Sequence, residues 1–446
     1  MVPRQSGVAA GMRVPFTVID EAILGLDTPA EPWSIQLELG VVGRFDLERL
    51  RHAVGQALDH HPMARARLLP PRRHDRYHTW EIAPRPDLDP LGVRECPGDD
   101  ALAAARAELY SLRVPLTESP PLRMRLTRGP VSDVLMLNAS HVAFDGFGAL
   151  RLLHSVARAY GGRPEPPPPV DLATARDLGT HLRAQDRSTR RRRAGRLAEK
   201  LRDLARPPAR LAPDRPSDRP GYGFHHVALS PERTRTLVGL HVPGTLNDVL
   251  VAALNLSIAG WNEAHGARCG RIGVLVPVNL RPREWQYEVA TNFVLESRVS
   301  VPAHRRVTPE STLEAVVEET REIKEGGGVA LMDVLDASAP LPIWAKEQLS
   351  ALLSLAGNRL VDTAVLSNLG KLDDPPSFGG EAGGTSEVWF SAPARMPCGL
   401  SVGVATAGER LHLVFRYRYP MWDADAAAAF ARRYVTDLGR FAAQPW

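Results

Sequence analysis

Hydrophobic residues recur along the chain with two different periods, and the period predicts where strands and helices lie. Apolar and polar residues alternate through 33–42 (WSIQLELGVV), which is typical of a strand. Apolar residues then recur every three to four positions through 47–61, which is typical of a helix with one buried face. Asp46 is placed to cap the start of that helix, and Pro62 would end it.

The rest of the first half continues this mixture. Short apolar segments predict strands at 76–83, 120–129 and 132–141, and a turn at Gly129-Pro130 joins the last two. The segment 147–162 has helical spacing and ends in Gly161-Gly162, a typical helix C-cap. Strands and helices are therefore interleaved before residue 165.

The second half repeats the interleaving. We expect strands at 224–230, 271–282, 292–301 and 362–370, a hairpin at 400–419 that turns at Ala407-Gly408, and helices at 245–266, 311–326 and 423–444. Thr245 or Asn247 lies at the start of the first of these helices, where the pair Asn247-Asp248 is best explained as capping. Hairpins among interleaved helices and strands predict an α/β fold with mixed sheets.

Composition divides the chain into two parts joined by an unusual connection. The protein has 446 residues, 44% of them hydrophobic, and a net charge of +4. A proline-rich segment, 163–171, is followed by residues 181–210, which carry ten Arg and one Lys against two Asp and one Glu. We therefore expect an N-terminal lobe at 1–165, a connection at 166–220 and a C-terminal lobe at 221–446.

Other global features exclude several classes of protein. The three cysteines, Cys96, Cys269 and Cys398, are too few and too far apart for a disulfide framework or a CxxC zinc site. The N-terminus has no apolar signal-peptide core, and the longest apolar run is interrupted by Asn255 and Ser257. We therefore expect a cytoplasmic protein without a transmembrane segment.

The pair His141 and Asp145, in SHVAFDG, is the strongest chemical signal in the sequence. HxxxD alone occurs by chance, but five segments resemble, in order, those of the condensation-domain-like acyltransferases, a superfamily with the two-lobed chloramphenicol acetyltransferase-like fold. These segments are 45–68, the HxxxDG segment 140–146, the TLNDV helix 244–261, VNLRP with TNFV at 276–294, and VLSNLG at 365–370. The resemblance is nearest to wax ester synthase/diacylglycerol acyltransferase-like and polyketide-associated members.

One position departs from the peptide-synthetase condensation domains in this superfamily. They usually carry HHxxxDG, whereas this chain has Ser140 before His141. Other members, such as the plant HxxxD acyltransferases, also lack the first histidine. Ser140 therefore weakens the case for peptide-bond formation more than the case for catalysis.

The resemblance implies roles for the residues around this motif. His141 would be the general base, since an imidazole with a pKa near 6.5 can take a proton from an attacking hydroxyl or amine. Asp145 would be structural, in a buried ion pair with Arg281 or, as second choice, Arg283. Gly146 would let the backbone approach substrate closely or form a simple turn, and the sequence does not separate these two explanations.

Further residues are candidates for stabilising the oxyanion of a tetrahedral intermediate or for lining the substrate passage. They are Ser140, Asn292, and Ser367 with Asn368, which we expect in a turn. Turn chemistry is the alternative explanation for the serines and asparagines. The pairs His60-His61 and His225-His226 suggest a metal, but neither has further ligands at suitable spacing, so we expect histidines at the surface or at helix ends and no metal site.

Together these features predict an acyltransferase with an active-site tunnel between two lobes. It would transfer an acyl group from acyl-CoA or a phosphopantetheinyl carrier protein to a small-molecule hydroxyl or amine, with no bound cofactor, in secondary-metabolite or lipid biosynthesis. An ester product is our first choice and a free-standing amide-forming condensation enzyme the second. A non-catalytic condensation-like recruitment module is the alternative from another class.

The Arg-rich block leaves the partner question open. It would suit an acidic carrier-protein surface, the phosphates of coenzyme A or an anionic membrane face, although a solvated linker helix is the favoured explanation. It has no aromatic residues and no recognition motif, so we expect no nucleic-acid partner. Because each chain supplies both lobes, we expect a monomer.

Overall fold

The computed structural model describes residues 11–177, 207–285, 288–327, 341–346 and 362–442. Within these residues the strands form three sheets, and two of the sheets contain both parallel and antiparallel pairs. The structure thus confirms the predicted α/β class with mixed sheets. Among the described residues, none of the helices combines the length and apolar character that a membrane span requires.

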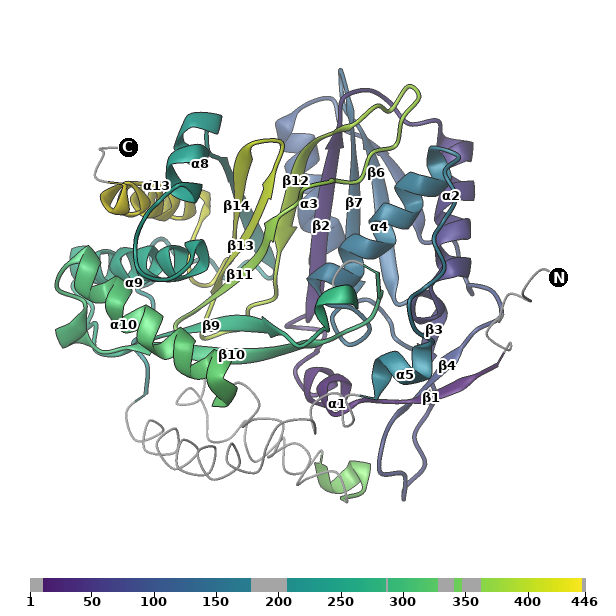
Figure 1. The fold of residues 1–446 in the computed structure, drawn as a ribbon, viewed down its shortest axis with the longest axis horizontal. Coiled ribbons are helices and arrows are strands. Elements are labelled where there is room, and N and C mark those ends of the chain that lie inside the picture. The colour runs from purple at the N-terminus through teal and green to yellow at the C-terminus, as the bar shows by residue number, and fades with distance from the viewer. Residues whose placement is uncertain (1–10, 178–206, 286–287, 328–340, 347–361, 443–446) are drawn as a thin grey trace.

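A five-stranded sheet carries the HxxxDG segment at the end of one strand. Its order is β12-β2-β7-β6-β5, with β2 at Ser34–Val41, β5 at Leu91–Glu95, β6 at Leu122–Arg128, β7 at Asp133–Ser140 and β12 at Thr385–Ser391. The helices α2 (Leu47–His60) and α4 (Gly146–Tyr160) pack against each other beside this sheet, and α3 (Asp99–Tyr110) contacts β6 and β7 (Figure 1).

A six-stranded sheet forms the other half of the molecule. Its order is β10-β9-β11-β13-β14-β8, with β8 at Tyr222–Ala228, β9 at Ile272–Asn279, β10 at Val294–Val301, β11 at Ala364–Lys371, β13 at Leu400–Ala407 and β14 at Arg410–Arg418. On the left of Figure 1 this sheet is covered by α9 (Leu246–Ala264), α10 (Pro309–Glu322) and α13 (Ala424–Phe441), while α8 (Pro231–Val238) contacts β14.

The remaining elements are short. The third sheet has the order β1-β4-β3, with β1 at Arg13–Pro15, β3 at Ala66–Leu68 and β4 at Thr79–Ile82. The helices α1 (Val18–Leu24) and α5 (Leu172–Arg176) lie near it in Figure 1. Single turns of other helix types occur at Pro62–Arg65, Arg283–Trp285, Ala303–Arg305 and Ile323–Gly327.

The strand β12 links the two large sheets, although it comes late in the chain. It pairs antiparallel with β2, so that Trp389 lies opposite Glu38. It also packs against β13 of the other sheet, where a Cβ on Gly403 would lie 1.9 Å from the carbonyl oxygen of Phe390. Only glycine allows the two strands to approach so closely. The sheets are therefore held together by backbone packing as well as by side chains.

Most of the predicted elements are present, with one correction. The hairpin turns at Gly408-Glu409, next to the predicted position, and Thr245 caps α9 in a capping box with Asp248. Ser367 and Asn368, expected in a turn, belong to β11, because they continue the parallel pairing with β13 up to an irregularity that begins after Asn368. Most of the Arg-rich block, 181–206, lies outside the described residues.

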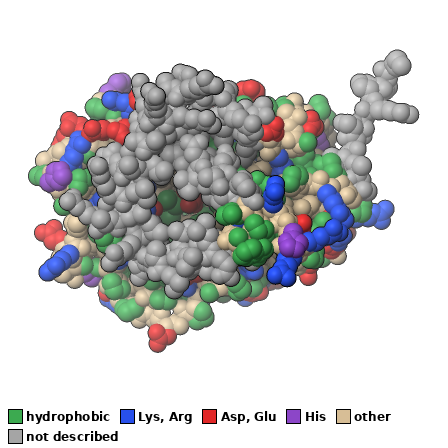
Figure 2. Space-filling model, turned by 90° about the horizontal axis from the view of Figure 1, so that it is seen from below, with side chains coloured by type: hydrophobic (Ala, Val, Ile, Leu, Met, Phe, Trp, Pro, Cys, Tyr) green, Lys and Arg blue, Asp and Glu red, His purple; other side chains and the backbone are tan. Residues whose placement is uncertain are grey.

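Side chains of both charges are visible on the face of the molecule that is shown from below. Figure 2 shows basic and acidic side chains of the described residues interspersed with hydrophobic ones on this face. A face dominated by one sign of charge would attract an oppositely charged macromolecule over long range. The described side chains visible in this view form no such face.

Candidate active site

A cavity of about 70 Å³ lies between the five-stranded and six-stranded sheets, and both contribute to its walls. From the first sheet and α4 come side chains at the ends of β2, β7 and β12, and from the second come side chains of β9, β10 and β11. The lining residues are Ile35, His141, Asp145, Gly146, Phe147, Pro277, Asn279, Val294, Glu296, Val365, Ser367, Asn368, Leu369, Phe390, Ala392 and Pro393.

His141 follows the last residue of β7 and is held in one orientation. Its backbone N–H donates to the carbonyl of Trp33 (3.0 Å), and its Nδ1 lies 2.9 Å from the carbonyl oxygen of Phe144. Since a carbonyl can only accept, Nδ1 must carry a proton. In the neutral ring the lone pair is then on Nε2, which leaves that nitrogen as the basic atom of a cavity-lining side chain.

Burial keeps this imidazole neutral. The residue is 5% exposed, and burial lowers the pKa of His141 below its ordinary value of 6.5, against a smaller opposing effect from Asp145. At neutral pH the ring is therefore unprotonated and able to accept a proton.

Asp145 does not orient the imidazole, because its oxygens are occupied elsewhere. Oδ1 accepts from the backbone N–H of Gly148 (2.8 Å) and caps α4, while Oδ2 accepts from Arg281 (2.6 Å) and from the N–H of Phe293 (2.8 Å). The guanidinium of Arg281 also donates to the carbonyl of Thr291 (2.6 Å). The predicted ion pair of Asp145 with Arg281 is thus present, and it joins the start of α4 to the segment before β10.

Two glycines bring the start of α4 close to other parts of the chain. A Cβ on Gly146 would lie 2.7 Å from the side chain of Leu369 and 3.1 Å from the ring of Phe390. A Cβ on Gly148 would lie 2.6 Å from the carbonyl oxygen of Thr291. Neither glycine has a left-handed backbone. Close approach, rather than turn geometry, therefore explains Gly146.

Asn292 and Ser140 support the loop beside the cavity. The Nδ2 of Asn292 donates to the backbone carbonyl of His141 (2.8 Å), and its Oδ1 accepts from the N–H of Val294 (3.1 Å). The Oγ of Ser140 accepts from the N–H of Val142 (3.3 Å). Both residues are buried, and neither lines the cavity. Their hydrogen bonds fix the backbone that carries His141.

Ser367 and Asn368, in contrast, both line the cavity, as does His141. The Oδ1 of Asn368 accepts from the N–H of Gly370 (2.7 Å), which sets the orientation of the amide and leaves Nδ2 to donate elsewhere. Gly370 has a positive φ of 77° where the pairing of β11 becomes irregular. The side chain of Ser367 faces the same side of the sheet as Val365 and Leu369, which also line the cavity, so its hydroxyl is a hydrogen-bond donor on the wall that the six-stranded sheet provides.

Sequence reasoning missed the contributions of β9 and β10 to the cavity. Pro277 and Asn279 on β9 and Val294 and Glu296 on β10 are alternate residues of paired strands, so they face the same side of the sheet. The sequence held no clear signal for Glu296, because this residue alternates with Arg298 and Ser300 along the strand, and such a row of polar residues is typical of a strand face exposed to solvent.

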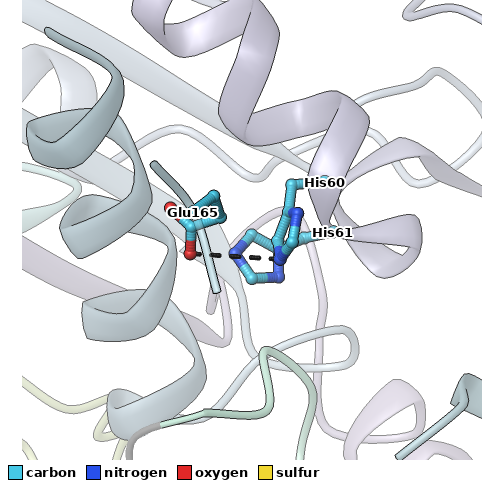
Figure 3. A group of neighbouring side chains, drawn as sticks. All are labelled: His60, His61 and Glu165. Atoms are coloured by element: carbon cyan, nitrogen blue, oxygen red, sulfur yellow. Dashed lines mark ion pairs between the residues drawn. The ribbon is translucent and has the colours of Figure 1, made fainter. Parts of the chain in front are cut away.

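His60 and His61 form a cluster with Glu165 at the end of α2 (Figure 3). These three residues offer ligand atoms within 4.8 Å of one another, so the chain does bring a third potential ligand to the histidine pair. His61 is buried rather than at the surface, although both histidines lie at a helix end as expected. The Nε2 of His60 lies 3.9 Å from Glu165, and the Nε2 of His61 lies 2.7 Å from the Oγ of Ser155.

The Glu165 carboxylate is already paired with a cation. Its Oε1 accepts from the guanidinium of Arg151 and from the Oγ of Ser155 (3.0 Å). Burial, with Arg151, lowers the pKa values of both histidines, so the rings are neutral at pH 7. The fixed positive charge of Arg151 opposes a second cation here, and a buried ion-pair network accounts for the cluster.

The other histidine pair lies on β8, away from the cavity. His226 is within 4.0 Å of Glu38, which is paired with Arg106. Burial and the charge of Arg106 lower the pKa of His226 to about 3. The pair does not take part in any group of three potential metal ligands among the described residues.

The two mixed sheets with a cavity between them form the condensation-domain-like, chloramphenicol acetyltransferase-like fold. The first condensation domain of the calcium-dependent antibiotic synthetase, solved with a substrate analogue, matches with a TM-score of 0.73 at 17% identity over 98% of each chain. The epimerization domain from the third module of tyrocidine synthetase B matches with a TM-score of 0.69 at 16% identity, also over 98% of each chain.

A third solved structure with this fold is a complex with C8-CoA. A mutant starter condensation domain of rhizomide synthetase, in complex with C8-CoA and Leu-SNAC, matches with a TM-score of 0.68 at 16% identity over 97% of this chain and 96% of that one. These similarities establish the fold. No protein-family model matches the sequence.

Sequence similarity places the chain in one family with two mycobacterial proteins. It is 35% identical over 428 residues to the uncharacterized proteins Rv2305 and MT2362 from two strains of Mycobacterium tuberculosis, covering 95% of this chain and 98% of theirs. The protein belongs to the same family as these two. A shorter match, 30% identical over 33% of this chain, is to 2% of the probable non-canonical nonribosomal peptide synthetase CymA of Salinispora arenicola.

Proposed function

We propose that the protein is an acyltransferase that moves an acyl group from a thioester to a hydroxyl or amine, with His141 as general base. The observation that carries this proposal is the imidazole in the cavity between the sheets, held neutral by burial and oriented through Nδ1. A base must be unprotonated at working pH and within reach of the substrate proton, and this geometry supports both conditions.

The chemistry follows from the positions of the side chains. The Nε2 of His141 takes the proton of the acceptor as its oxygen or nitrogen attacks the thioester carbonyl. The carbonyl oxygen then carries negative charge, and our candidates for stabilising it as hydrogen-bond donors are the cavity-lining residues Ser367 and Asn368. Collapse of the intermediate breaks the C–S bond, and the imidazolium supplies the proton that makes the leaving thiolate a thiol.

Two observations support a thioester donor. A starter condensation domain with the same fold binds C8-CoA, and another similar region belongs to a probable peptide synthetase. We propose coenzyme A or a phosphopantetheinyl carrier protein as the carrier of the acyl group. Ser140 in place of a first histidine keeps ester formation as our first choice for the product, in a biosynthetic pathway.

The test is thiol release from short, medium and long acyl-CoA thioesters, with alcohol or amine acceptors, by wild type and His141→Ala. We expect the variant to lose on the order of 10²- to 10⁴-fold in kcat/KM, the usual contribution of a positioned base. His52→Ala is the matched control, because His52 lies on the exposed side of α2. It should retain full activity.

Equal turnover by wild type and a folded His141→Ala variant would reject the base role. If neither releases thiol, but the protein binds a carrier protein tightly, the chain is a recruitment module instead. Circular dichroism and thermal unfolding show whether each variant is folded.

A further inference from the structure

Glu296 lines the same cavity as His141 and has no role in the mechanism described above. It lies on β10 opposite Pro277 of β9, and both side chains face the cavity with Asn279 and Val294. The helix α10 packs on the other side of β10, where Val299 and Val301 share a hydrophobic core with residues of that helix. The side chain of the half-buried Glu296 is thus directed to the site rather than to the core.

The surroundings of Glu296 disfavour a negative charge. No ion pair or hydrogen bond joins its carboxyl group to a described residue, in contrast to Asp145, which holds Arg281. The nearby acidic group is Asp362, itself paired with Arg298, and the buried thiol of Cys398 is also close enough to interact. Burial, reinforced by the Asp362 carboxylate, raises the pKa of Glu296 from its ordinary 4.5 to about 7.

The proposed reaction places further negative charge in this cavity. The tetrahedral intermediate has an oxyanion, and its collapse produces a thiolate. An ionised Glu296 would repel both in a space of about 70 Å³. A neutral carboxylic acid would instead offer an O–H donor, which a carboxylate lacks.

We propose that Glu296 is a second catalytic residue of this site, which acts in its protonated form by donating a hydrogen bond to the negative charge that develops on the thioester. The inference rests on the proposed acyl transfer and adds a residue to it. The active enzyme would then carry a neutral His141 and a neutral Glu296. The surroundings of His141 lower its pKa, so that it can accept a proton, and those of Glu296 raise its pKa, so that it keeps its proton.

The test is the pH dependence of kcat/KM for thiol release from octanoyl-CoA between about pH 6.5 and about pH 9. The acceptor is an alcohol, because the hydroxyl group of an alcohol does not titrate between these pH values. Wild-type activity should fall on the order of a hundredfold between about pH 6.5 and about pH 9, as Glu296 loses its proton. Glu296→Gln keeps an N–H donor and cannot titrate, so it should stay active without this fall. Glu296→Ala, which has no donor, should lose activity at every pH.

Glu314→Gln is the matched control, because it removes the same charge from an exposed position on α10. It should keep the wild-type pH profile. A Glu296→Gln variant that keeps the wild-type fall above pH 7 overturns the role of Glu296, while a loss of turnover in His141→Ala in the same assay leaves the acyltransferase proposal standing. A wild type that releases no thiol overturns both.

An infrared measurement covers the case in which the Glu296 variants fold poorly. Wild type and Glu314→Gln should show the carbonyl stretching band of a protonated carboxylic acid that disappears as the pH rises through about 7. Absence of a titrating band in wild-type protein overturns the proposal. Where Glu296→Gln folds, the band should be missing from its spectrum.

Discussion

Asp145 and Glu296 line one cavity, but their partners give the two carboxyl groups different properties. Asp145 accepts from three hydrogen-bond donors, one of them the guanidinium of Arg281, whereas no ion pair joins Glu296 to a described residue and the nearby Asp362 carboxylate adds to the effect of burial on its pKa. The HxxxDG motif predicted the first residue and its ion pair from a resemblance. Nothing local to residue 296 predicted the second, because its surroundings come from segments far away in the sequence.

Replacing Asp145 should harm stability before it harms chemistry. Asp145→Ala leaves Arg281 buried without its counter-ion, and breaking such a pair costs about 3–5 kcal/mol. Urea unfolding would measure this loss. Asp171→Ala is the control, since Asp171 caps the short helix α5 at an exposed site, and its loss should lower stability far less than the loss of Asp145.

A fully stable Asp145→Ala protein with a selective loss of turnover would contradict this structural role. The variant Arg281→Met with Asp145→Ala should be less destabilised than the two single changes suggest when added, because no unpaired charge remains.

At the start of α4, some features follow from the local sequence and others depend on tertiary contacts. Its helical period and its glycine end were readable in the sequence, and so was the strand before it. The contact of Gly148 with the backbone of Thr291 could not be predicted from the sequence, because the two residues are distant in the chain. The same holds for β2, where alternation predicted a strand but not that Gln36 and Glu38 are buried against partners from α3 and β12.

Gly148→Ala should be destabilising even though alanine favours helices. Its Cβ would lie 2.6 Å from the Thr291 carbonyl oxygen, so the backbone must shift, at a cost of about 1–3 kcal/mol. Gly55→Ala is the matched control within α2, where a Cβ would contact nothing and the change should stabilise by about 0.5–1 kcal/mol. Thermal unfolding of both variants gives the comparison, and equal effects would rule out the contact as the cause.

At the scale of the molecule, the sequence predicted two lobes and their order but not how they are joined. The period of the hydrophobic residues predicts helices and strands, and the alternation of helices with strands along the chain predicts the fold class. The order of strands within a sheet depends instead on contacts between residues that lie hundreds of positions apart. The five-stranded sheet takes β12 from beyond residue 384, next to β2. The lobe boundaries at 165 and 221 remain a prediction from composition, and they do not predict that β12, from the second half of the chain, joins the sheet of the first half.

A fragment of residues 1–165 should therefore be poorly soluble. It would lack β12 and expose the hydrogen-bonding edge of β2, and a free strand edge promotes aggregation. Size-exclusion chromatography and circular dichroism would measure the outcome, with the full chain as control. A monomeric fragment with native-like secondary structure would show that β12 is dispensable for this half.

The position of β12 also limits how the protein can be recombined with its mycobacterial relatives. A chimera made by a single exchange in the proline-rich connection would combine β2 from one parent with β12 from the other, and with it the paired residues Glu38 and Trp389. A design that transplants residues 385–391 together with the first half keeps this interface from one parent. Such a chimera requires three crossovers, one in the connection and one on each side of β12, whereas a chimera with a single crossover would pair β2 and β12 from different parents.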